Sequence, residues 1–218
     1  HPMTAKNPDY IVVEGPIGVG KTSLARRLAE TFETELLLEG AEVNPFLERF
    51  YQDPPSGALP AQLFLLLQRA RQMKERRKGD IFQTVRVADF LMEKDRLFAR
   101  LTLDDDELQL YEQAYEHLAV DAPVPDLVIY LQAPVDVLLK RIAKRGISCE
   151  RRIDAEYLRR LSDAYARMFH FYDEAPLLIV NAEKINLVDR EEDYQALVEQ
   201  VCIIRKGRHY FNPVPFTL

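Results

Sequence analysis

A glycine-rich segment near the start of the chain limits most strongly what this sequence can fold into. Gly15 to Thr22 read Gly-Pro-Ile-Gly-Val-Gly-Lys-Thr and fit the complete G-x-x-x-x-G-K-[ST] pattern of a phosphate-binding loop. An apolar, β-rich run at 10–14 precedes the loop, and a helix-favouring run at 23–30 follows it. In this context the glycines let backbone N–H groups crowd around phosphate oxygens, and the positive end of the helix favours the anion. The sequence therefore predicts a site for a nucleoside triphosphate.

Side chains in and around the loop have predictable tasks. Lys21 would bring positive charge to the β- and γ-phosphates of ATP, and the Thr22 hydroxyl would reach Mg²⁺. A glycine-rich turn that binds nothing is the alternative, and the complete pattern in its complete context argues against it. The expected ATP-binding residues, including two arginines from a later basic segment, are Gly15, Pro16, Ile17, Gly18, Val19, Gly20, Lys21, Thr22, Ser23, Arg141 and Arg145.

Size and charge exclude several classes of protein. We expect one domain over residues 3–218 of the 218, with His1 and Pro2 a remnant of cloning. A net charge of −6 without a basic stripe argues against a nucleic-acid partner. The longest aliphatic runs, such as 63–67, are far shorter than the ~20 residues of a membrane span. No signal-peptide pattern or zinc cluster is recognised, and Cys149 and Cys202 lack metal-site spacing, so we expect a cytoplasmic protein without a disulfide.

Apolar strand-like runs alternate with amphipathic helical stretches along the chain, which predicts a doubly wound α/β fold. The expected parallel sheet has five strands, at 10–14, 34–39, 84–89, 127–131 and 177–180. The expected helices lie at 23–30, 43–52, 59–77, 90–101, from 104 onward and at 134–144. Pro54-Pro55-Ser56-Gly57 is expected to break the chain, and the prolines of the tail at 207–218 disfavour regular structure.

Two acidic residues end predicted strands, where ligands gather in sheets of this kind. Glu39 follows the second strand and could accept the proton of an alcohol while orienting its oxygen for in-line attack. A solvated acid in a turn is the alternative for Glu39. Asp89 follows the third strand and could hold Mg²⁺ together with Thr22, partly through water. Its alternative role is to cap the next helix, and the two roles are compatible.

Two further groups of side chains could contact a ligand. Gln62 and Arg69 lie seven positions apart and project from nearly the same helix face, where they could recognise a nucleobase edge. An ordinary helix surface would give the same pattern. A basic segment could close as a lid over phosphates, or its cations could complement a helix C-terminus. That segment contains Arg141, Lys144, Arg145, Arg151 and Arg152.

Several spaced segments together resemble the deoxyribonucleoside kinase family, particularly its bacterial deoxyguanosine/deoxyadenosine kinase branch. They are 15–22, Glu39, 44–54, 59–64, 89–99 and 145–158. The resemblance implies a P-loop kinase fold with a lid segment and ATP-dependent phosphorylation of the 5′-hydroxyl of a deoxyribonucleoside. It also implies Mg²⁺ and a homodimer packed through helices. Purine substrates are the first expectation, and deoxycytidine or a broad set of deoxynucleosides is the alternative.

The resemblance assigns roles residue by residue. Glu39 corresponds to the carboxylate that acts on the 5′-hydroxyl, Gln62 to the amide that pairs with the base, and Tyr51 and Glu150 to the pair that holds the 3′-hydroxyl. Residues 181–186 should line the adenine of ATP. The expected catalytic residues are Glu39, Lys21 and Arg145, the last as a lid arginine. The expected substrate-binding residues are Glu39, Tyr51, Gln62, Arg69, Asp89, Lys94, Asp95 and Glu150, with Arg69 and Asp95 as a pair facing the base.

The chain departs from the family pattern in two places. Many members carry an arginine directly after the acid of the third strand, whereas this chain reads Asp89-Phe90-Leu91. We expect Lys94, rather than Arg96, to supply the missing charge, unless the lid does so. Ile147 stands where some members have another lid arginine. Two alternatives stay open. One is a nucleoside monophosphate kinase, which needs more cations for an acceptor phosphate. The other is a non-catalytic nucleotide-binding protein, which an intact Glu39 and Lys21 argue against.

Overall fold

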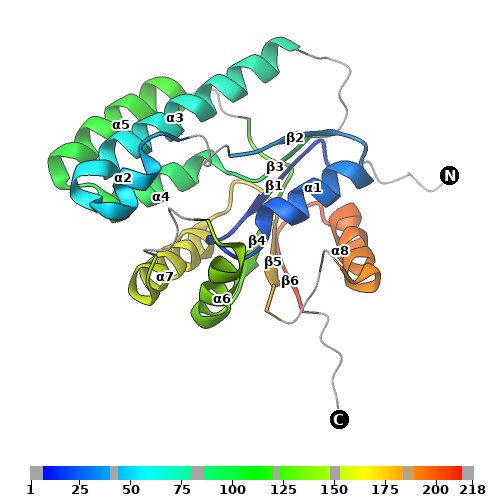
Figure 1. Cartoon of the computed structure of the whole chain (residues 1–218). Coiled ribbons are helices and arrows are strands. Elements are labelled where there is room, and N and C mark those ends of the chain that lie inside the picture. The colour runs from blue at the N-terminus through cyan, green and yellow to red at the C-terminus, as the bar shows by residue number, and fades with distance from the viewer. Residues whose placement is uncertain are drawn as a thin grey trace.

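The computed structural model describes residues 7–39, 44–79, 86–119, 123–147, 153–183, 187 and 189–212. Within them a parallel six-stranded sheet has the order β2-β3-β1-β4-β5-β6, which confirms the predicted α/β class (Figure 1). The strands are β1 (Tyr10–Glu14), β2 (Glu35–Leu37), β3 (Arg86–Ala88), β4 (Leu127–Gln132), β5 (Leu177–Asn181) and β6 (Arg208–Phe211). The two central strands are almost entirely apolar and buried, as expected where helices cover both faces of a parallel sheet.

Helices lie on both sides of this sheet (Figure 1). They are α1 (Lys21–Thr31), α2 (Leu47–Gln52), α3 (Pro54–Gly79), α4 (Met92–Thr102), α5 (Asp105–Ala119), α6 (Val135–Arg145), α7 (Ala155–Phe171) and α8 (Glu191–Ile203). On one side α1 lies beside α8, where the Arg27 guanidinium stacks 3.8 Å from the centroid of the Tyr194 ring. On the other side α3 and α7 pack against α4, and α5 lies next to α3. No helix in the described part of the chain is long and apolar enough to span a membrane.

The sheet has one strand more than the sequence predicted. β6 lies in the tail at 207–218, where regular structure was not expected, and pairs in parallel with β5. The prolines of the tail follow this strand and lie outside the described residues. β6 is an edge strand with exposed residues at three of its four positions, so it lacks the apolar signal of the buried strands.

The expected chain break at 54–57 is wrong, because α3 begins at Pro54. Prolines are tolerated in the first turn of a helix, where the missing N–H has no intrahelical partner. Gly57 lets α2 approach closely, since a Cβ there would lie 2.4 Å from a backbone nitrogen of α2. Pro60 lies inside α3 and cannot donate to the Ser56 carbonyl, which instead accepts a 2.7 Å hydrogen bond from Arg49 Nη2.

Candidate active site

The phosphate-binding loop connects β1 to α1 at the carboxyl edge of the sheet (Figure 1). Gly18 has a φ of 88°, and a Cβ at this position would lie 2.9 Å from the Leu138 carbonyl oxygen of α6. The loop therefore needs glycine here both for its backbone conformation and for its packing. Together with the ends of β2 and β3 and with residues of α3, α4 and α7, the loop lines a cavity of about 560 Å³.

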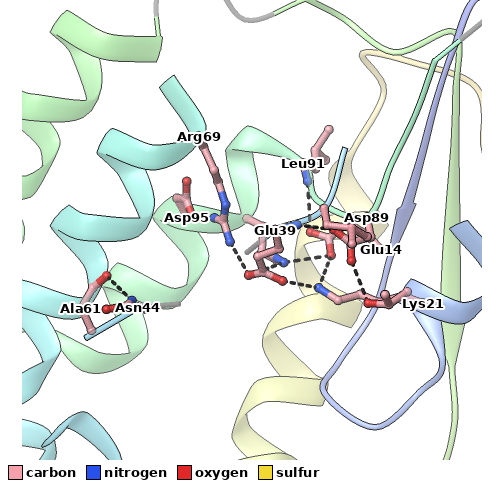
Figure 2. Close-up of polar contacts among 12 residues, drawn as sticks. Glu14, Lys21, Glu39, Asn44, Ala61, Arg69, Asp89, Leu91 and Asp95 are labelled. Atoms are coloured by element: carbon pink, nitrogen blue, oxygen red, sulfur yellow. Dashed lines mark hydrogen bonds and ion pairs between the residues drawn. The ribbon is translucent and has the colours of Figure 1, made fainter. Parts of the chain in front are cut away.

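The Glu39 carboxylate, just after β2, is the central anion of this cavity. It lies 2.8 Å from Lys21 Nζ and 3.1 Å from Lys94 Nζ, and it also pairs with the Arg69 guanidinium. Figure 2 shows Glu39 between Lys21 and Arg69. Burial alone would raise the pKa of Glu39, but the three cations outweigh burial and hold the pKa well below its usual range. Glu39 is therefore a fully ionised acceptor, and the alternative of a solvated turn acid is excluded.

Glu14, the last residue of β1, is a site residue that the sequence analysis missed. Its side chain is fully buried and lies 3.4 Å from Lys21 Nζ and 3.2 Å from Lys94 Nζ. It also accepts hydrogen bonds from the backbone N–H groups of Gly15 and Leu91 (Figure 2). A carboxylate ending an otherwise apolar strand, directly before the loop, is the signal that could have identified it, because charges are rarely buried without partners.

Lys94, on α4, lines the same cavity as Glu39 and is fully buried. Burial lowers its pKa to about 8; Glu14 and Glu39 oppose this shift, while Lys21 and Arg69 add to it. Arg96, the other candidate for the missing positive charge, instead forms a 2.6 Å ion pair with Glu112 of α5. The structure thus brings Lys94, and not Arg96, to Glu39.

Asp89 connects Glu39 to Thr22 at the end of the phosphate-binding loop. Its Oδ2 accepts a 2.7 Å hydrogen bond from Thr22 Oγ1, and its Oδ1 accepts a 2.6 Å bond from the Glu39 backbone N–H. Leu91, rather than Asp89, is the N-cap residue of α4, so the capping alternative for Asp89 is wrong.

Gln62 and Arg69 face inward from α3, which excludes the helix-surface alternative. Gln62 is 4% exposed and lines the cavity, and Arg69 is 0% exposed. Arg69 forms an ion pair with Asp95 of α4, whose side chain is also fully buried. Phe90 is buried, with its ring centroid 5.3 Å from the Arg69 guanidinium carbon. The predicted Arg69–Asp95 pair is therefore present.

Some of the remaining predicted residues are described by the structure, and the others lie outside its described part. Arg145 and Ile147 line the cavity, whereas Arg141 donates to the carbonyl oxygens of Val19 and Ala182 and so joins the loop to the segment after β5. Asn181 Oδ1 accepts from the Glu183 backbone N–H. Outside the described part of the chain lie the Tyr51 side chain, Glu150, Arg151, Arg152 and residues 184–186.

Comparisons with known proteins point to one family. The family model described as deoxynucleoside kinase matches residues 11–205. Deoxyguanosine kinase of Bacillus subtilis (strain 168) is 32% identical over 201 residues, covering 88% of this chain and 95% of the relative. Deoxyadenosine kinase of Lactobacillus acidophilus is 30% identical over 205 residues, covering 88% and 94%. The structure of M. mycoides deoxyadenosine kinase with bound dATP has a TM-score of 0.75 at 23% identity, covering 88% of this chain and 98% of that one, and so shares the fold.

Proposed function

Since this chain belongs to the deoxynucleoside kinase family, we propose that it transfers the γ-phosphoryl group of ATP to the 5′-hydroxyl of a purine deoxynucleoside. The observation that carries this proposal is the ionised Glu39, which lies against the P-loop lysine in the same cavity as Gln62. The purine preference is supported by the substrates named for the relatives and by the buried Arg69–Asp95 pair. That pair could also serve deoxycytidine, which is the second candidate.

The contact between Lys21 and Glu39 suggests how ATP would prepare the acceptor side. A single ammonium group cannot neutralise both the carboxylate and the incoming phosphates. When ATP binds, Lys21 turns to the β- and γ-phosphates, and Glu39 loses the cation that lies 2.8 Å away. Its pKa then rises from the depressed value, which makes Glu39 a better acceptor for the proton of the 5′-hydroxyl.

Lys94 replaces the arginine that is missing after Asp89. Its ammonium group lies 3.1 Å from the Glu39 carboxylate and 3.2 Å from a second carboxylate, that of Glu14. This pairing keeps a cation beside Glu39 after Lys21 has turned to the phosphates. Lys94 therefore orients the carboxylate and stabilises negative charge that develops on the acceptor oxygen.

Thr22 and Asp89 fit a magnesium ion. A hydroxyl and a carboxylate oxygen lie 2.7 Å apart at the start of α1, and Mg²⁺ prefers such hard oxygen ligands. Within the described residues no group of three or more His, Cys, Asp or Glu side chains could hold a metal, so phosphate oxygens and water would complete the coordination. When bound, Mg²⁺ neutralises charge on the transferred phosphoryl group. Asp89 also holds the backbone of Glu39, and so couples the metal to the acceptor side.

We also propose a homodimer, and a cytoplasmic protein that draws on the ATP of that compartment. Leu67 on α3 and Leu110 on α5 are each 52% exposed, and these helices lie side by side at the outer edge of the molecule (Figure 1). Exposed large apolar side chains on neighbouring helices are typical of a surface that packs against a partner. A second copy of the chain would cover them.

An ATP-dependent phosphorylation assay over the four deoxynucleosides and dGMP tests the proposed function. We expect turnover of deoxyguanosine or deoxyadenosine. Absence of turnover with every deoxynucleoside, while ATP still binds, would refute the kinase proposal, and turnover of pyrimidines alone would refute the purine preference. Phosphorylation of dGMP instead would identify a nucleoside monophosphate kinase.

The role of Glu39 is tested by Glu39→Gln, which keeps the shape of the side chain and removes its charge. We expect kcat to fall by about 10²–10⁴, as for the loss of a general base. Glu199→Gln on the exposed face of α8 is the matched control and should leave kcat unchanged. Near-normal turnover of Glu39→Gln would show that another group accepts the proton.

A further inference from the structure

Tyr165, on α7, has a ring that its neighbours hold in one orientation. The residue is 0% exposed. The ring meets Phe98 of α4 edge-on, with centroids 6.1 Å apart, and stacks on Tyr130 of β4 at a centroid distance of 6.1 Å. Phe169, one turn further along α7, stacks on it as well. These ring contacts fix the direction of the hydroxyl group, and none of them is a hydrogen bond to it.

The register of the sheet places this ring beside the reacting groups. Glu14 of β1 lies opposite Tyr130 of β4 in parallel pairing, so both side chains project from the same face of the sheet. Lys94, which pairs with Glu14 and Glu39, stacks on Phe98, with its Nζ 5.7 Å from the ring centroid. Tyr165 thus contacts both aromatic residues that flank the Glu14–Lys94–Glu39 group.

Tyr165 is among the residues that line the same cavity as Glu39, and its buried hydroxyl has no hydrogen-bond partner among the described residues. Leaving a buried hydroxyl unpaired costs stability, so such a group calls for an explanation. Burial raises the pKa of Tyr165 well above its usual value, and the nearby Glu14 and Glu39 add to this shift. The hydroxyl therefore keeps its proton and is available as a donor.

We propose that Tyr165 is a further substrate-contacting residue of the acceptor site, whose hydroxyl donates a hydrogen bond to the reacting 5′-oxygen of the bound deoxynucleoside. This inference rests on the proposed kinase activity. Glu39 can only accept a hydrogen bond, so it orients the proton of the 5′-hydroxyl and leaves the lone pairs of that oxygen unoriented. A donor on the other side would fix the oxygen for in-line attack. The vacant donor of Tyr165 meets this need, in addition to the positive charge that Lys94 brings to the same oxygen.

The test compares Tyr165→Phe with Tyr172→Phe in steady-state kinetics and in urea unfolding. Tyr172 ends α7 and packs edge-on against Phe169, and its buried hydroxyl likewise has no partner among the described residues. It is not among the residues that line the cavity. For Tyr165→Phe we expect kcat/KM for the deoxynucleoside to fall about 10- to 100-fold, while KM for ATP stays unchanged and stability is equal to or above that of the wild type. Tyr172→Phe should leave both kinetic parameters unchanged.

Each outcome decides one question. Wild-type kcat/KM in Tyr165→Phe would overturn the inference while the kinase activity stood. A rise in KM for ATP with unchanged nucleoside parameters would place the hydroxyl on the phosphate side and also overturn it. An equal fall of activity in both variants would show a structural effect of these tyrosines and would also overturn the inference. If the wild-type protein phosphorylated no deoxynucleoside at all, the proposed function itself would be wrong.

Discussion

Replacement of the buried cation Lys94 by methionine is the sharpest test of how the acceptor site is held together. Methionine has nearly the length of the lysine side chain and no charge. Lys94→Met therefore keeps most of the packing and removes the ammonium group that lies between Glu14 and Glu39. Both the stability and the activity of the protein should respond.

The size of the effect follows from two distances. At an effective dielectric constant of about 20, each contact at 3.1–3.2 Å corresponds to an attraction of about 5 kcal/mol before the cost of burying the charges is subtracted. Removing one partner of a buried pair typically costs about 3–5 kcal/mol, because it leaves an uncompensated charge. We expect Lys94→Met to lower the free energy of unfolding by that amount. Removing the facing anion as well, in Glu14→Gln/Lys94→Met, should recover part of the loss, with a coupling near the upper end of about 0.5–3 kcal/mol.

Urea unfolding of the wild type, both single variants and the double variant completes the cycle, with Arg96→Met as control. The guanidinium of Arg96 is partly exposed and pairs with Glu112, so its loss should cost no more than about 1 kcal/mol. The folded double variant should still have a strongly reduced kcat, whereas Arg96→Met should retain activity. The reasoning is refuted if Lys94→Met costs no more than Arg96→Met, or if Glu14→Gln leaves the loss of stability unrelieved.

Three further predictions concern pH, metal and assembly. As pH rises through about 8, Lys94 loses its proton and kcat should fall. In a pH–rate profile of Lys94→Arg this fall in kcat should occur at higher pH, because arginine keeps its proton. Asp89→Asn should raise the Mg²⁺ concentration for half-maximal activity; an unchanged titration would place the metal elsewhere. Leu110→Lys should shift the protein toward monomer in sedimentation velocity, and a wild type that is already monomeric would contradict the dimer.

Prediction from sequence succeeded where neighbours along the chain carry the information. The phosphate-binding loop is such a case, because eight consecutive residues and the two flanking elements define its backbone. The buried strands were equally predictable, since their apolar runs reflect helices on both faces of the sheet. β6 and the first turn of α3 were missed for the opposite reason. An exposed edge strand has a weak pattern, and the prolines that begin α3 read locally as a break.

Only the tertiary structure showed that Glu14 lies among the charges of the site. Glu14, Glu39, Arg69 and Lys94 come from four different segments, and no local pattern predicts that ion pairs link their side chains. Lys94 was expected from the sequence in preference to Arg96, and it is Lys94 that reaches Glu39, because two positions along a helix point about 200° apart. The sequence by itself determined that a triphosphate site lies on a parallel sheet. The packing of α3, α4 and α7 over that sheet decided which buried charges lie together beside the phosphate-binding loop. A charge that is buried away from water is stabilised only by the partners next to it.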